Sequence, residues 1–199
     1  MAKFFANLWL VLFVGLAVAV LIVVLPSSGY SDAGGTSDPV VSVLKWLHVF
    51  FGVTWIGLLY YFNFVQTPTM PTIPAELKPG VSKYIAPKAL FYFRWGAAMT
   101  VLTGLLLAWS YHELRRALTL DPSARLIGIG MYLALIMAFN VWFIIWPNQK
   151  KVLGIVDAAA DKKAAAARIA GMTSRINTML SIPMLYCMVA QKNVAGLGF

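Results

Sequence analysis

The chain has 199 residues, of which 60% are hydrophobic and only 12% are charged, and its formal net charge is +9. A soluble domain usually carries about twice that share of charge, so the composition excludes an ordinary soluble protein and predicts an integral membrane protein. In such a protein, lysine and arginine gather in loops on one side of the bilayer, so we expect a lipid bilayer and no nucleic acid as partner. These residues contain no CxxCH or HExxH motif, which excludes a covalent c-type haem and a zincin-type zinc site within them.

Five apolar segments are long enough to cross a bilayer, which takes about 20 residues. The first, Phe4–Leu25, has a longer apolar core than a signal peptide and no cleavage site close behind it, so we expect an uncleaved anchor. The other four spans are expected at Leu44–Gln66, Ala89–Tyr111, Leu126–Trp146 and Thr173–Ala190. The sequence therefore predicts an all-α membrane protein with about five transmembrane helices in one bundle. Residues 1–42 would form an anchor helix and a polar loop, and residues 43–199 a four-helix membrane domain.

The connections between these spans differ in character. The segment Thr67–Lys88 contains five prolines, which predicts a surface loop or a re-entrant loop rather than a regular helix. Pro147 is expected to end the fourth span. The alanine-rich, charged segment Asn148–Gly171 predicts a cytoplasmic amphipathic helix that lies in solvent or at the membrane interface before the last span.

The basic residues set the expected orientation. With a cytoplasmic N-terminus, ten lysine and arginine residues including Lys3 fall on the cytoplasmic side, and five including Lys192 on the other. The positive-inside rule therefore predicts a multi-pass protein of a bacterial inner membrane, with a cytoplasmic N-terminus and a periplasmic C-terminus.

One face of the second span is a candidate cofactor site. His48, Gly52 and Trp55 share this face at helical spacing, where a glycine leaves room for a flat cofactor and an imidazole can bind haem iron. Haem b is therefore a candidate cofactor, with His48 as ligand. Small residues also serve close helix packing, so a histidine hydrogen-bonded to a neighbouring helix is the alternative. His112 is expected on the same side as His48, and the two form a candidate metal site unless His112 is a solvated loop residue.

Polar side chains near the opposite ends of the spans form a second candidate site. A guanidinium group binds carboxylates and planar anions through two hydrogen bonds. The residues of this candidate substrate or anion pocket are Arg94, Asn148, Gln149, Arg175 and Asn177. The alternative is structural hydrogen bonding between helices, with Arg94 extending to the interface. No catalytic residue is predicted.

Four blocks of the sequence, in order, resemble a known family. They are WLHVFFGVTWIGLLYYFNFVQTP, FRWGAAMTVLTGLLL, NVWFIIWPNQKKVLG and SRINTMLSIPMLYCMVA. They resemble the N-terminal membrane domain of the bacterial membrane-bound urate hydroxylases over about Leu44–Ala190. The resemblance implies a haem ligand at His48 and polar site residues at the five positions named above. Family members that oxidise urate carry a C-terminal cytochrome c domain, and with no CxxCH motif here we expect a separate cytochrome.

Three functions follow as expectations. The first is a small membrane subunit of a redox or electron-transport assembly that binds b-type haem through His48. The second is an accessory or assembly subunit of a larger membrane complex, without a cofactor. The third is a urate-type oxidase that passes electrons to a separate cytochrome. Other membrane subunits or a cytochrome are the expected protein partners.

Overall fold

The computed structural model describes residues 6–24 and 39–191. Lys3 and Lys192, which entered the predicted orientation, lie outside the described residues. The chain divides into two compact units, Met1–Ser42 and Val43–Phe199. The described part of the first unit contains the apolar helix α2 (Leu8–Val24), which corresponds to the first expected span.

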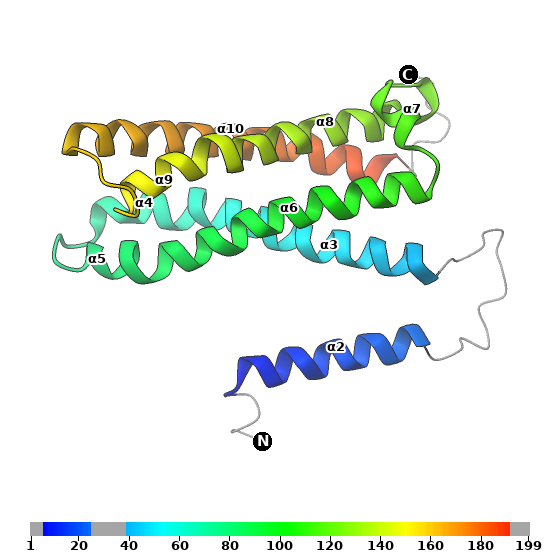
Figure 1. Ribbon diagram of the computed structural model, residues 1–199, viewed down its shortest axis with the longest axis horizontal. Helices are drawn as coiled ribbons and strands as arrows, with labels where there is room; N and C mark the ends of the chain where they lie inside the picture. The colour runs from blue at the N-terminus through cyan, green and yellow to red at the C-terminus, as the bar shows by residue number, and fades with distance from the viewer. Residues whose placement is uncertain (1–5, 25–38, 192–199) are drawn as a thin grey trace. The chain divides into compact units, whose positions relative to one another are not determined.

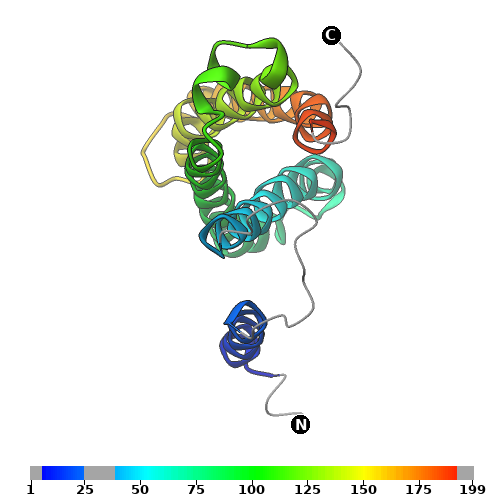
Figure 2. The ribbon, with the colours of Figure 1, turned by 90° about the vertical axis from the view of Figure 1, so that its right-hand side faces the viewer.

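Four long helices make up the second unit, and Figures 1 and 2 show them side by side in a ring. Several of them include turns of π-helix or 3₁₀-helix, which are labelled η. The first consists of α3 (Pro39–Tyr60), η1 (Tyr61–Gln66), α4 (Thr67–Thr69) and η2 (Met70–Thr72). The second consists of α5 (Lys78–Gly80), η3 (Val81–Ile85) and α6 (Ala86–Ser110). After α7 (Leu114–Leu118), the third consists of η4 (Pro122–Ala124), α8 (Arg125–Phe139), η5 (Asn140–Ile145) and α9 (Trp146–Val152), and the fourth is α10 (Ala160–Ala190).

Three of the long helices are long and apolar enough to cross a membrane: Val40–Thr72, Lys78–Ser110 and Pro122–Val152. The fold is therefore helical and of a membrane-compatible kind, as predicted, but only three of the five expected spans meet this criterion among the described residues. The helix α2 has 17 residues, and the first half of α10 is charged. The three membrane-compatible helices have 31 to 33 residues. A helix of 33 residues is about 50 Å long, whereas the hydrocarbon core of a bilayer is about 30 Å thick, so these three helices would extend well beyond the core.

Two expectations about proline were wrong. Within Thr67–Lys88 only residues 73–77 are non-helical, and the third helix continues through Pro147 to Val152. In both places a π-helical turn precedes the proline. The backbone N–H of the residue before the proline bonds five residues back, as Thr67 does to Phe62 and Trp146 to Val141. The wider turn shifts the carbonyl that a proline ring would strike, so the helix continues past the proline.

The alanine-rich segment was also predicted incorrectly. It does not form a separate helix, because residues 160–171 are the first part of the continuous 31-residue helix α10. Ala166 and Ala170 are buried, at 2% and 1% exposure, so one side of this part packs into the bundle, while most of its other residues are exposed. Alanine favours the helix and its small side chain permits close packing, whereas the sequence interpretation considered only the first property.

Polar contacts join each helix to the next around the ring. His48 of the first helix forms a hydrogen bond with the Thr100 carbonyl of the second. Trp142 Nε1 of the third helix donates to the Arg94 carbonyl of the second at 3.2 Å. Asn140 Nδ2 of the third helix donates to Asn177 Oδ1 of the fourth at 2.8 Å. Asn63 Nδ2 of the first helix donates to the Ser174 hydroxyl of the fourth at 2.8 Å. These bonds close the ring that Figure 2 shows.

Candidate functional site

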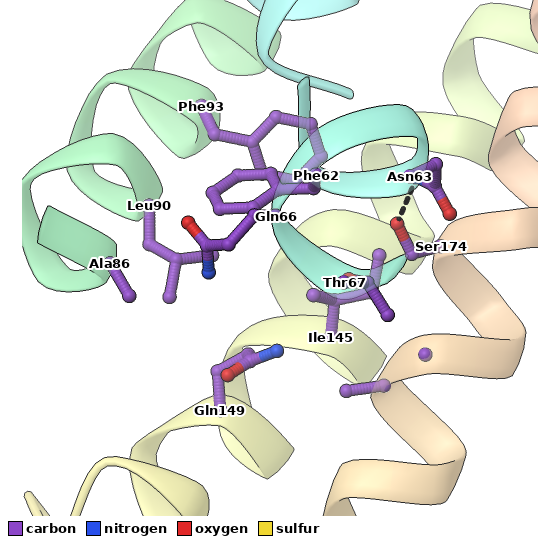
Figure 3. Close-up of a pocket in the computed structure, with 12 residues that line it drawn as sticks. Phe62, Asn63, Gln66, Thr67, Ala86, Leu90, Phe93, Ile145, Gln149 and Ser174 are labelled. Atoms are coloured by element: carbon purple, nitrogen blue, oxygen red, sulfur yellow. Dashed lines mark hydrogen bonds between the residues drawn. The ribbon is translucent and has the colours of Figure 1, made fainter. Parts of the chain in front are cut away.

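A pocket of about 70 Å³ lies at the end of the bundle where α9 and α10 meet the η1 turn. All four long helices contribute to its wall, as Figure 3 shows. The first helix contributes Phe62, Asn63, Gln66 and Thr67, the second Ala86, Leu90 and Phe93, the third Ile145 and Gln149, and the fourth Ala170, Gly171 and Ser174.

Two π-helical turns line this pocket and a third ends next to its lining residue Ala86, and each turn is followed two residues later by a proline. The turns are η1, η3 and η5, and the prolines are Pro68, Pro87 and Pro147. Turns of this kind often occur at functional sites, because they change the direction in which neighbouring side chains point. Here η1 supplies three pocket residues and η5 one, so the turns that admit the prolines also shape the pocket.

The pocket combines aromatic walls with amide groups. Phe62 and Phe93 meet edge to face, with ring centres 5.6 Å apart. Gln66 and Gln149 point into the space from opposite sides (Figure 3). The Gln66 Oε1 is buried and accepts no hydrogen bond from the described part of the chain, which is unfavourable unless a ligand or water donates to it. The Asn63 amide is already engaged by Leu59 O and Ser174.

This end of the bundle is strongly basic. Residues 61–94 and 145–177, which contain the pocket-forming halves of the helices, carry ten lysine and arginine residues and only three acidic ones. A pocket within such a surface attracts anions and raises their local concentration.

The five polar residues of the predicted anion pocket do not converge. Gln149 lines the pocket, whereas the Asn148 amide bonds Ile144 O in its own helix and Arg175 is exposed. Asn177 is fully buried, and its amide joins Asn140 to the Met137 carbonyl. The Arg94 guanidinium stacks on Trp146, 3.3 Å from the ring centre.

The His48 face packs against α6. His48 Nδ1 lies 3.0 Å from Thr100 O and 3.3 Å from Thr103 Oγ1. A methyl group added at Gly104 would come within 2.8 Å of His48 Cε1, so the imidazole rests on that glycine. With Nδ1–H donating to the Thr100 carbonyl, Nε2 carries the lone pair, which is the arrangement of most metal-binding histidines. No described residue forms a hydrogen bond with Nε2.

Gly52 and Trp55 lie on this same contact with α6. A methyl group added at Gly52 would meet Thr100 Cγ2 at 3.9 Å. Trp55 is fully buried in the core, where Gly96 approaches its backbone, and its Nε1 has no hydrogen-bond partner. His112 is exposed in the turn after α6 and adopts a positive φ of 55°. His112 follows Gly104, on which His48 rests, by eight residues, and eight residues of helix correspond to about 12 Å. No group of three His, Cys, Asp or Glu residues suited to a metal occurs in the described ranges.

Sequence reasoning did not assign to the pocket Asn63, Gln66, Thr67, Ser174 or the two phenylalanines. Ser174 is 111 residues from Asn63, its hydrogen-bond partner, and such a distant pairing leaves no local pattern. The prolines did carry a signal. Pro68, Pro87 and Pro147 each follow a π-helical turn by two residues, although the first two were interpreted as part of a loop and the third as the end of a span.

These features define a helical protein with membrane-compatible spans and an amide-lined pocket at the basic end of its bundle. Residues 107–195 match the family model described as urate oxidase N-terminal, so this part of the chain is similar to that family. The matched segment contains α8, η5, α9 and α10 and therefore the pocket residues Gln149 and Ser174. No curated protein and no solved structure matches the chain.

Proposed function

We propose that this protein is a multi-pass membrane subunit of a redox system, and that its pocket binds a small planar anion of the urate class. A separate cytochrome would accept the electrons. The observation that carries the proposal is the unpartnered Gln66 carbonyl, buried in an aromatic-walled pocket at the basic end of the bundle. The match to the urate oxidase N-terminal family over the third and fourth helices supports it.

The chemistry of urate is complementary to this lining. Urate is planar, is an anion at neutral pH, and presents both N–H donors and carbonyl acceptors around its rings. The Gln66 Oε1 can accept from a ligand N–H, and the Gln149 amide, which no described residue bonds, can donate to a ligand carbonyl. Phe93 and Phe62 provide apolar walls for the ring faces.

The pocket has to widen to admit a fused ring system, because its volume of about 70 Å³ suits only a few water molecules. The two glutamine side chains that point into it are unbranched and can rotate aside. The surrounding basic residues would concentrate the anion at the entrance. Their placement agrees with the proposal that this end is cytoplasmic in a bacterial inner membrane.

Binding of urate to the purified protein tests the proposal. We expect saturable binding that weakens at high salt and an affinity for urate above that for an uncharged methylated purine. Gln66→Leu should weaken binding about tenfold, which corresponds to one or two lost hydrogen bonds. Asn148→Ala is the matched control, since this amide lies beside Gln149 in sequence but bonds its own helix. Absence of saturable binding, or an equal loss in the control, would contradict the proposal.

A second candidate function is electron transfer through haem b at His48, and the hydrogen bond from Nδ1 to Thr100 O favours it. Haem would supply one-electron chemistry, and His48 would hold it through Nε2. A reduced-minus-oxidised spectrum with pyridine haemochrome quantitation tests this. About one b-type haem per chain, lost in His48→Ala, is the expected result. A flat spectrum of the wild-type protein would leave His48 as a helix-packing residue and favour a cofactor-free accessory subunit.

A further inference from the structure

Arg94 carries an unpaired positive charge in a helix that is apolar enough to cross a membrane. Its Nε and Nη1 are buried and have no hydrogen-bond partner within residues 6–24 and 39–191. The helices Lys78–Ser110 and Pro122–Val152, which pack together around it, contain no acidic residue. An arginine at membrane depth is normally paired or extends to the interface. Its stack on Trp146 leaves the charge without a counter-ion among the residues that the structure describes.

A second cation approaches the same indole ring. Lys150 Nζ lies 5.9 Å from the centre of the Trp146 ring, and the Arg94 guanidinium carbon lies 3.3 Å from it. The two cationic groups are therefore no more than about 9 Å apart. Two positive charges at this separation repel each other, and an anion between them would remove the repulsion.

Two further tryptophan side chains, Trp142 and Trp95, lie beside this cluster. Trp142 Nε1 donates to the Arg94 carbonyl, and the Trp95 and Trp142 rings meet edge to face at 5.6 Å. Trp95 remains 48% exposed on the outside of the bundle. Tryptophan concentrates where hydrocarbon meets headgroups, and Lys150 follows Trp146 by one turn toward the basic end.

We propose that Arg94, Trp146 and Lys150 bind the phosphate of an anionic phospholipid, with Trp95 and Trp142 against its glycerol and upper acyl chains. Basic pockets between membrane helices bind anionic headgroups in this way. Neither Arg94 nor Lys150 lines the amide pocket, so this site goes beyond the proposed function and does not depend on it. The phosphodiester is the recognised group, and the acyl chains distinguish a lipid from a soluble phosphate.

Quenching of tryptophan fluorescence by brominated lipids in mixed micelles tests the proposal. Brominated phosphatidylglycerol is compared with brominated phosphatidylcholine, and glycerol 3-phosphate serves as a soluble competitor. We expect the wild-type protein to prefer phosphatidylglycerol at least fivefold. Lys150→Gln and Arg94→Gln should reduce the preference to less than twofold. The matched control is Lys83→Gln, which removes one exposed charge from the same end of the bundle.

The preference for phosphatidylglycerol in the wild-type protein and in the three variants decides the outcome. A wild-type preference that Lys150→Gln abolishes and Lys83→Gln preserves supports the site, even if Arg94→Gln does not fold. An absent preference, a preference that survives Lys150→Gln, or an equal loss in the Lys83 control overturns it. Displacement by millimolar glycerol 3-phosphate would instead identify a soluble phosphate ester as the ligand and would overturn the assignment to lipid.

Discussion

Gly104→Ala should disturb the His48 contact without removing the histidine. A methyl group at Gly104 would lie 2.8 Å from His48 Cε1, which is closer than real Cβ atoms approach, and 3.2 Å from Nδ1. The imidazole would have to turn, and its bonds to Thr100 O and Thr103 Oγ1 hold it in place. The substitution should therefore break at least one of these bonds.

Two opposing effects set the magnitude. Replacing a helical glycine by alanine stabilises by about 0.5–1 kcal/mol. Loss of the His48 bond costs about 0.5–1.5 kcal/mol, and displacement of the packed ring adds about 1 kcal/mol or more. The net effect should be destabilising by about 1 kcal/mol. Gly57→Ala is the matched control, because nothing lies within 4 Å of a methyl group there, and it should show the stabilising effect alone.

Thermal unfolding in detergent measures both variants. At about 2–4 °C per kcal/mol for a chain of this size, Gly104→Ala should melt several degrees below Gly57→Ala. In a His48→Ala background the difference should disappear, because the clash partner is gone. If Gly104→Ala melts with Gly57→Ala in the wild-type background, the packing of His48 on Gly104 is refuted.

Three further outcomes follow from other contacts. Asn177→Ala should lower the free energy of unfolding by about 2–3 kcal/mol, since it leaves the buried Asn140 amide without its acceptor; a double-mutant cycle in detergent would measure the coupling. Gly128→Ala should reduce the folded yield, because the new methyl group would strike the Ala117 carbonyl. The pKa of Asp121 is lowered because the Ser123 hydroxyl donates a hydrogen bond to its carboxylate. The ionised Asp121 carboxylate therefore stabilises the folded protein above its ordinary pKa of 3.8, and this stabilisation is lost as the pH falls below that value. The melting temperature of Asp121→Asn should not show this loss when it is measured in acid.

The hydrophobic segments predicted the helices well, because their length and composition are local properties. The second, third and fourth expected spans overlap the three membrane-compatible helices, which are about ten residues longer. What failed was the treatment of proline. The rule that proline breaks a helix assumes a regular α-helix, whereas a π-helical turn before Pro68, Pro87 and Pro147 admits each ring without ending the helix.

The candidate sites were predictable only in part. Polar residues near the ends of spans were identified, and Gln149 does line the pocket. The direction in which each side chain points from its helix was not predicted. It separates Arg94, which stacks on Trp146, from the exposed Arg175. A shift of one residue turns a side chain by about 100°, so a polar layer in sequence does not define a pocket. The hydrogen bond between Asn63 and Ser174 shows the same limit, since it depends on how distant helices meet.

The His48 site and the amide-lined pocket can be tested separately, because they lie at different levels along the first and second long helices. His48 rests on Gly104, whereas the pocket uses Phe93, eleven residues earlier on α6. That interval corresponds to about 16 Å of helix, and residues this far apart without shared partners act nearly independently. His48→Ala should therefore leave urate affinity unchanged, and Gln66→Leu should leave any haem content unchanged. If both substitutions altered both measurements, the variants would be reporting collapse of the helix bundle rather than two sites.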